Sequence, residues 1–131
     1  MVLNSYIYAV PKKYHKIRTK YIVRELKKEN NGGIGEEISQ WIGNYVLHDW
    51  MLSLYKDRSG RSVDTFNGEY LELHKRDLKR LEQNLNAGLL DDDGFWTKEQ
   101  VLENRRQLLV CVAVCKYILQ IKKRLFYFAC C

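Results

Sequence analysis

The sequence lacks long apolar runs, and that absence excludes a helix that spans a membrane. Its longest unbroken apolar run, residues 108–115, is eight residues long, whereas a spanning helix needs about 20. The first residues also lack the basic start, apolar stretch and cleavage site of a secretory signal. We therefore expect a cytoplasmic protein with no membrane partner.

Cysteine is present, but not with the spacing of a disulfide scaffold or a zinc site. Cys111 and Cys115 lie within an apolar helical pattern, and Cys130 and Cys131 are adjacent. Disulfide-rich secreted domains spread their cysteines along the chain, and structural zinc sites place pairs of ligands on turns. We expect buried thiols in a reduced protein, with no metal and no cofactor.

The sequence also lacks motifs for catalysis and for binding cations. It contains no nucleophile elbow, phosphate-binding loop, dinucleotide-binding glycine motif or H-E-x-x-H pair. The three histidines, His15, His48 and His74, have no evident carboxylate relay in the sequence. The acidic run at residues 91–94 does not have the ligand spacing of an EF-hand, so we interpret it as a solvated loop. We expect no catalytic residues and no enzyme activity.

Positive charge is concentrated in two segments of the chain. Of the net charge of +6, residues 1–29 carry +6, residues 30–115 carry −4 and residues 116–131 carry +4. This distribution favours a localised basic face over a uniformly basic protein. The 131 residues are 46% hydrophobic and 29% charged, which is typical of a globular protein, and we expect one domain over residues 1–131.

Strand-forming residues gather at both ends of the chain and near its middle. Residues 5–10 form such a segment, which ends at Pro11, the only proline. Residues 125–131 form an aromatic segment at the other end. An Asn-Gly pair, the strongest short hairpin signal, separates residues 63–66 from 69–73. We expect two terminal strands and a central hairpin.

Helical periodicity predicts four helices between these strands. They cover residues 11–28, residues 35–55, residues 77–88 and a last, longest segment that begins at Thr97. Thr97 and Gln100 fit the capping box that starts a helix. The order of elements predicts an α+β fold, in which a small antiparallel or mixed β-sheet is packed by about four helices.

The helix predicted over residues 35–55 carries the candidate partner-binding residues. These are Trp41, Tyr45, His48 and Trp50. Trp41 and His48 are two helical turns apart, so a helix would place them on one face, where indoles around a histidine could hold an aromatic ligand or a base. The alternative is that the tryptophans and His48 pack in the core, and we expect Ile42 and Tyr45 in the buried stripe of this helix.

The helix predicted over residues 11–28 carries the candidate nucleic-acid-binding residues. These are Lys12, Lys13, Lys16, Arg18, Lys20 and Arg24. Tyrosines alternate with these positive charges, and such a composition suits a phosphate backbone. The alternative is a solvated surface helix.

Two short motifs resemble a small, uncharacterised protein family of phages and prophages. Residues 37–41 (E-I-S-Q-W) and 47–51 (L-H-D-W-M) resemble its E-I-x-Y-W-R-K…(I/L)-H-x-W segment, with the same Trp-to-His and His-to-Trp spacings. The first strand, the third helix and the aromatic last strand extend the resemblance over most of the chain. The sequence departs from the family at Ile42-Gly43, which replaces Arg-Lys, and at residues 127–131, which replace a Tyr-Asp-Ser-Trp-Trp pattern.

The resemblance implies a phage or prophage setting in the bacterial host cytoplasm and no assigned enzyme activity. We hypothesise an accessory protein that binds and modulates a host protein, with inhibition of host defence, in the manner of an anti-CRISPR protein, as one version. The net charge of +6 argues against a mimic of DNA. The alternative hypothesis is a nucleic-acid-binding module that uses the basic segment 11–28. Self-association through the many Trp and Tyr residues also stays open.

Overall fold

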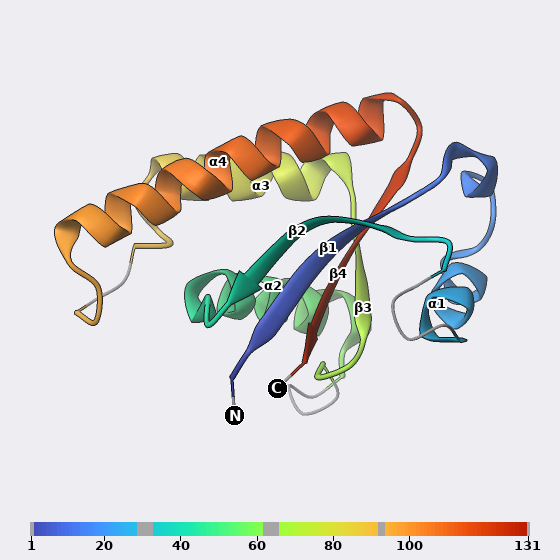
Figure 1. The fold of residues 1–131 in the computed structure, drawn as a ribbon, viewed down its shortest axis with the longest axis horizontal. Coiled ribbons are helices and arrows are strands. Elements are labelled where there is room, and N and C mark those ends of the chain that lie inside the picture. Colours follow the sequence, from blue (N-terminus) through green and yellow to red (C-terminus); the bar gives the residue numbers. More distant parts are fainter. Residues whose placement is uncertain (1, 29–32, 62–65, 92–93, 131) are drawn as a thin grey trace.

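The two ends of the chain meet as neighbouring strands in the centre of a β-sheet (Figure 1). This computed structural model describes residues 2–28, 33–61, 66–91 and 94–130. Strand β1 covers Asn4–Val10 and strand β4 covers Arg124–Cys130, and the two pair antiparallel along their whole length. The prediction of terminal strands is confirmed.

Two edge strands complete an antiparallel sheet in the order β2-β1-β4-β3. Strand β2 (Glu36–Ile42) pairs with β1, and strand β3 (Tyr70–Leu73) pairs with β4. The predicted α+β class is therefore correct. The predicted central hairpin is not observed as such, because β3 pairs with β4 and Phe66 lies outside any strand, while residues 62–65 lie outside the described part of the chain.

The helix predicted over residues 35–55 is wrong in its first half, which forms strand β2. The apolar residues of this segment recur at helical spacing, but they form a strand that ends at Ile42. Gly43 then adopts a φ of +73°, which separates the strand from the helix that follows. Helix α2 (Tyr45–Ser59) begins only afterwards, where the Asn44 side chain accepts a hydrogen bond of 3.2 Å from the Leu47 backbone N–H. Trp41 and His48 therefore lie on different elements and share no helical face.

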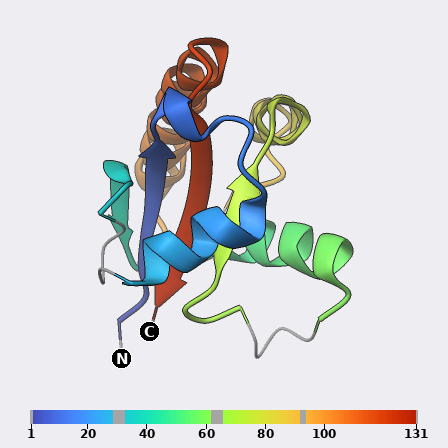
Figure 2. The ribbon, with the colours of Figure 1, turned by 90° about the vertical axis from the view of Figure 1, so that its right-hand side faces the viewer.

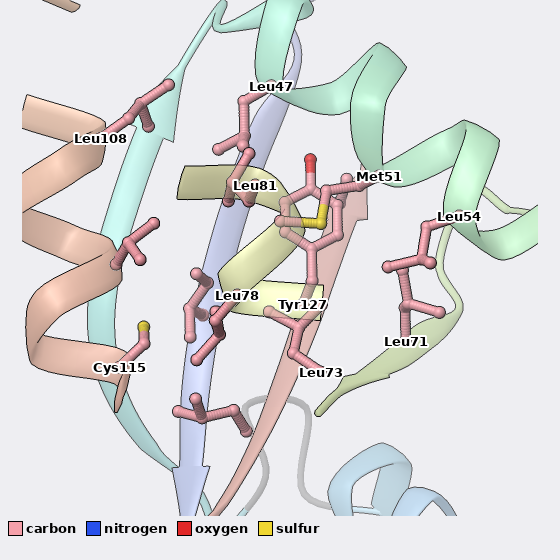
Figure 3. Close-up of a cluster of buried hydrophobic side chains, with 14 of the residues drawn as sticks. Leu47, Met51, Leu54, Leu71, Leu73, Leu78, Leu81, Leu108, Cys115 and Tyr127 are labelled. Carbon is pink, nitrogen blue, oxygen red and sulfur yellow. The ribbon is translucent and has the colours of Figure 1, made fainter. Parts of the chain in front are cut away.

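Three helices cover one face of the sheet and enclose the main core (Figures 1 and 3). They are α2, α3 (Lys75–Asn86) and α4 (Lys98–Gln120). The predicted capping box starts α4, because Thr97 and Gln100 exchange side-chain hydrogen bonds with each other's backbone N–H at 2.8 and 3.2 Å. In Figure 3, side chains of these helices meet strand residues such as Leu73 and Tyr127.

The long helix α4 is apolar on two sides. Leu108, Val112 and Cys115 are buried against the sheet, whereas Val110 and Tyr117 on the outer side are 55% and 61% exposed. At its N-terminal end, Arg105 forms an ion pair of 2.5 Å with Asp91, the one described aspartate of the acidic run, since residues 92–93 lie outside the described part.

The opposite face of the sheet is covered by helix α1 (Thr19–Lys28), which crosses in front of the strands in Figure 2. Ile22 and Leu26 of α1 pack against Val10 and Phe126 in a second, smaller core. The helix predicted over residues 11–28 is thus interrupted: a short 3-10 helix, η1 (Lys12–Tyr14), precedes α1.

A buried arginine explains this interruption. The guanidinium of Arg124 donates hydrogen bonds to the backbone carbonyls of Tyr14 and Ile17, which a continuous helix would use itself. It also donates to both carboxylate oxygens of Glu72, at 2.7 and 2.8 Å, and to the Thr19 hydroxyl at 2.9 Å. Arg124 therefore fixes the basic N-terminal segment onto strands β3 and β4.

Candidate functional site

An open groove lies between the end of β2 and the first half of α4. Its volume is about 650 Å³. Residues 41–44 line one side, and side chains between Trp96 and Gln107 line the other. The groove therefore combines segments that are more than fifty residues apart in the sequence.

Hydrogen bonds fix the two sides of the groove relative to each other. The side-chain amide of Asn44 donates to Asn104 Oδ1 at 2.9 Å and so joins the start of α2 to α4. Asn44 is 6% exposed and also caps α2 through Leu47. Because the capping box at Thr97 sets the first turn of α4, the groove is formed by anchored elements rather than by a free loop.

Aromatic and aliphatic side chains give the groove its binding character. Trp41 and Trp96 line it, and both are half-buried. Ile42, which also lines the groove, is 70% exposed. Tyr45, which begins α2, and Phe95, which precedes Trp96, are 54% and 96% exposed. Ile42 and Tyr45 thus lie at the surface instead of in the buried stripe that the sequence predicted.

Among the described residues, two carboxylates, Glu99 and Glu103, and no cation line the groove. Glu103 is already paired: it accepts hydrogen bonds from Arg106 at 2.6 and 3.0 Å and from Gln107 at 3.0 Å. These hydrogen bonds lower the pKa of Glu103, so it stays ionised. Within the described residues Glu99 has no such partner, so it is the carboxylate that is open to a ligand.

His48 and Trp50 do not contribute to this groove. His48 Nδ1 lies 3.0 Å from the Tyr127 hydroxyl, and its ring stacks on Phe66 with the centroids 5.3 Å apart. Burial lowers the pKa of His48, although Asp49 opposes the shift. Trp50 lines a different hollow, beside Arg80 of α3. The alternative that His48 is an internal, hydrogen-bonded histidine fits this geometry.

Of the residues that line the groove, the sequence identified only Trp41 as a candidate site residue. Trp96, Asn44 and Asn104 were not among the candidates, although Trp96 directly precedes the capping box of α4. The one local signal for Trp96 is its position between the acidic run and the start of the helix. The contact of Asn44 with Asn104 has no local signal in the sequence.

A pair of thiols on α4, Cys111 and Cys115, lines a small apolar hollow together with Trp41. The Sγ atoms of Cys111 and Cys115 are 3.9 Å apart, and the Ser39 hydroxyl lies 3.5 Å from Cys111. The hydrogen bond with Cys115 lowers the pKa of the Cys111 thiol despite its burial. Over the described ranges, no three His, Cys, Asp or Glu side chains are arranged to hold a metal.

The basic candidates separate into two groups. Lys12, Lys13 and Lys16 line a hollow that also contains Lys122 from the turn after α4. Lys20 and Arg24 instead lie over the ring of Tyr21, at 5.1 and 5.3 Å from its centroid. Arg18 lies in the connection between η1 and α1.

Comparisons with known proteins assign no family to this geometry. No helix in the described part of the chain is long and apolar enough to cross a membrane. No family model, curated protein or solved structure matches the chain.

Proposed function

We propose that this chain is a binding protein that recognises a segment of another protein in the groove between β2 and α4. The single observation that carries the proposal is the placement of Trp41 and Trp96 in one open groove with the exposed Ile42. Tryptophans in such positions dominate the binding energy of protein interfaces. An exposed apolar surface around a groove is typical of an interaction site.

The chemistry of the groove indicates what kind of segment it accepts. An apolar or aromatic side chain of the partner would pack between the two indoles. A lysine or arginine next to that side chain would meet Glu99, which has no cationic partner among the described residues. The amide nitrogen of Asn104 and the amide oxygen of Gln107, which are not the atoms bonded to Asn44 and Glu103, add polar groups that suit the backbone of an extended peptide.

The biological setting of the proposal comes from the resemblance to phage and prophage proteins. In that setting, the chain acts in the bacterial cytoplasm by occupying a surface of a host protein, and inhibition of a defence protein is one such action. The two positions at which the sequence departs from the Arg-Lys of that family, Ile42 and Gly43, both line the groove. We infer that, where the family has two cationic side chains, this chain has an apolar surface formed by Ile42 and Gly43.

Site-specific photocrosslinking in a bacterial host tests the proposal. A benzoylphenylalanine at Ile42 reports on the groove, and the same residue at Tyr117, which is 61% exposed on the distant half of α4, is the matched control. We expect a single protein adduct at Ile42 and none at Tyr117. The crosslinked segment of the partner should contain an apolar residue next to a lysine or arginine.

Two tryptophan variants decide whether the groove itself binds the captured protein. Trp96→Ala should weaken the purified complex at least about 30-fold, as expected for a central interface residue. Trp50→Ala removes an equally large side chain outside the groove and should leave the affinity unchanged, with circular dichroism as the check on folding. Equal adducts at the two crosslinking positions, no adduct at Ile42, or full affinity of Trp96→Ala would overturn the proposal.

A further inference from the structure

A basic surface lies around the turn that follows α4, at the right-hand side of Figure 1, with η1 on one side of the turn and the start of α3 on the other. One hollow of about 370 Å³ is lined by Lys12, Lys13, His15, Lys16 and Lys122. Lys122 also lines a second hollow, together with Lys75, Lys79 and Lys116. We refer to these two adjoining hollows as the basic surface.

Most of the positive charge on this surface is not compensated. Among the residues that the structure describes, Lys116 forms an ion pair with Glu82 at 2.9 Å, and Glu82 is the one acidic residue that lines either hollow. The other lysines of the surface form no ion pair with any carboxylate in the part of the chain that the structure describes. These lysines are exposed, so their charges add up to a positive potential that attracts an anion to this part of the surface.

We propose that the basic surface binds the phosphate backbone of a nucleic acid. Several lysines without an ion-pair partner among the described residues line two hollows that share Lys122. They suit a chain of closely spaced monoanions, because each ammonium group can neutralise one phosphate and release its counterion. The hollowed shape favours a polymer strand over the flat surface of a membrane. This interaction goes beyond the proposed protein-binding groove and does not depend on it.

The surface differs from the nucleic-acid interface that the sequence predicted. Lys12, Lys13 and Lys16 belong to both, and Lys13 also lies over the ring of Tyr14 at 5.2 Å, whereas Lys20 and Arg24 line neither hollow. Lys122, in the turn after α4, lines both hollows. Its φ is +70°, a conformation in which residues other than glycine are uncommon. The fold thus replaces half of a linear basic segment with lysines from two other elements.

Fluorescence anisotropy with a labelled 20-nucleotide single strand tests the inference. Contacts with about six phosphates predict a log–log salt slope near −4, which is roughly a 300-fold loss of affinity between 50 and 200 mM salt. The variant Lys13→Gln/Lys16→Gln/Lys122→Asn should reduce the slope to about −2. Asparagine is chosen at position 122 because it tolerates a positive φ.

The matched control removes three positive charges elsewhere. Lys28→Gln/Lys56→Gln/Lys98→Gln has the same net charge as the test variant but keeps both hollows, so its slope should stay near −4. Equal losses in the two variants would mean that only the net charge matters and would overturn the inference. Absence of oligonucleotide binding, or binding only to phosphatidylglycerol vesicles, would overturn it as well.

Discussion

Replacement of Glu72 by glutamine should destabilise the fold strongly, because Glu72 neutralises a buried arginine. The side chains of Arg124 and Glu72 are 10% and 11% exposed. Glu72 accepts two hydrogen bonds from the guanidinium and one of 2.6 Å from the Thr19 hydroxyl. Glutamine keeps the shape of the side chain but leaves the Arg124 charge without its counterion in a nearly dry site.

The expected loss is about 3 kcal/mol in the free energy of unfolding, the lower end of the range for breaking a buried ion pair. For a domain of this size it lowers Tm by about 10 °C. Urea denaturation followed by circular dichroism at pH 7 measures the loss directly. Glu103→Gln is the control, because Glu103 also pairs with an arginine but its side chain is 50% exposed, and its replacement should produce little or no change.

The same variant predicts a pH dependence with a defined sign. Burial raises the pKa of Glu72, but hydrogen bonds from Arg124 and Thr19 outweigh it and lower the pKa below its usual 4.5. The stabilisation by Glu72 is therefore complete above pH 4.5 and is lost as the pH falls through the lowered pKa. A difference between wild type and Glu72→Gln below about 1 kcal/mol at pH 7, or one that grows as the pH falls below 4.5, would refute this reasoning.

Three further predictions concern single residues. Wild-type stability should fall as the pH drops below 6.5, because burial lowers the pKa of His48 and the folded state resists its protonation; urea titrations at pH 7.5 and 5.5 should show a smaller fall in His48→Gln. Met51→Ala should cost about 2–5 kcal/mol in the same assay because Met51 is 0% exposed in the core, whereas a similar cost for Ile42→Ala would contradict the assigned burial. Lys122→Gly should raise the stability by about 1 kcal/mol, since glycine adopts a φ of +70° without strain, and an unchanged or lower Tm would show that the turn is not strained.

Much of the fold follows from local patterns in the sequence. The terminal strands are recognisable by their aromatic and β-branched residues, and the start of α4 by its capping box. The helix predicted over residues 35–55 failed because Ile38, Trp41, Ile42 and Tyr45 recur at a helical spacing by coincidence. The Gly43-Asn44 pair carried the correct signal, since a positive φ and a helix cap together begin a new element.

The candidate site was predictable only in part, because both surfaces depend on contacts between distant segments. Trp41 and Tyr45 could be selected as large aromatic residues, but the tertiary contact that joins Asn44 to Asn104 places Trp96 beside Trp41. In the same way, the interruption of the basic helix depends on Arg124, more than one hundred residues away from the carbonyls that it binds. Local periodicity contains no information about such a partner.

Lys122 links the stability of the fold to the proposed nucleic-acid interaction. Its backbone conformation favours glycine, so a lysine at this position costs stability that the surrounding structure has to offset. In this conformation the Lys122 side chain lines both hollows, so its ammonium group adds to the positive charge of each. If Lys122→Gly stabilises the fold and also reduces the salt slope of oligonucleotide binding, the two effects have one cause, namely a strained turn that holds a functional cation. A gain in stability without any change in the slope would instead assign the strain to the turn alone, because the charge at position 122 would then contribute nothing to binding.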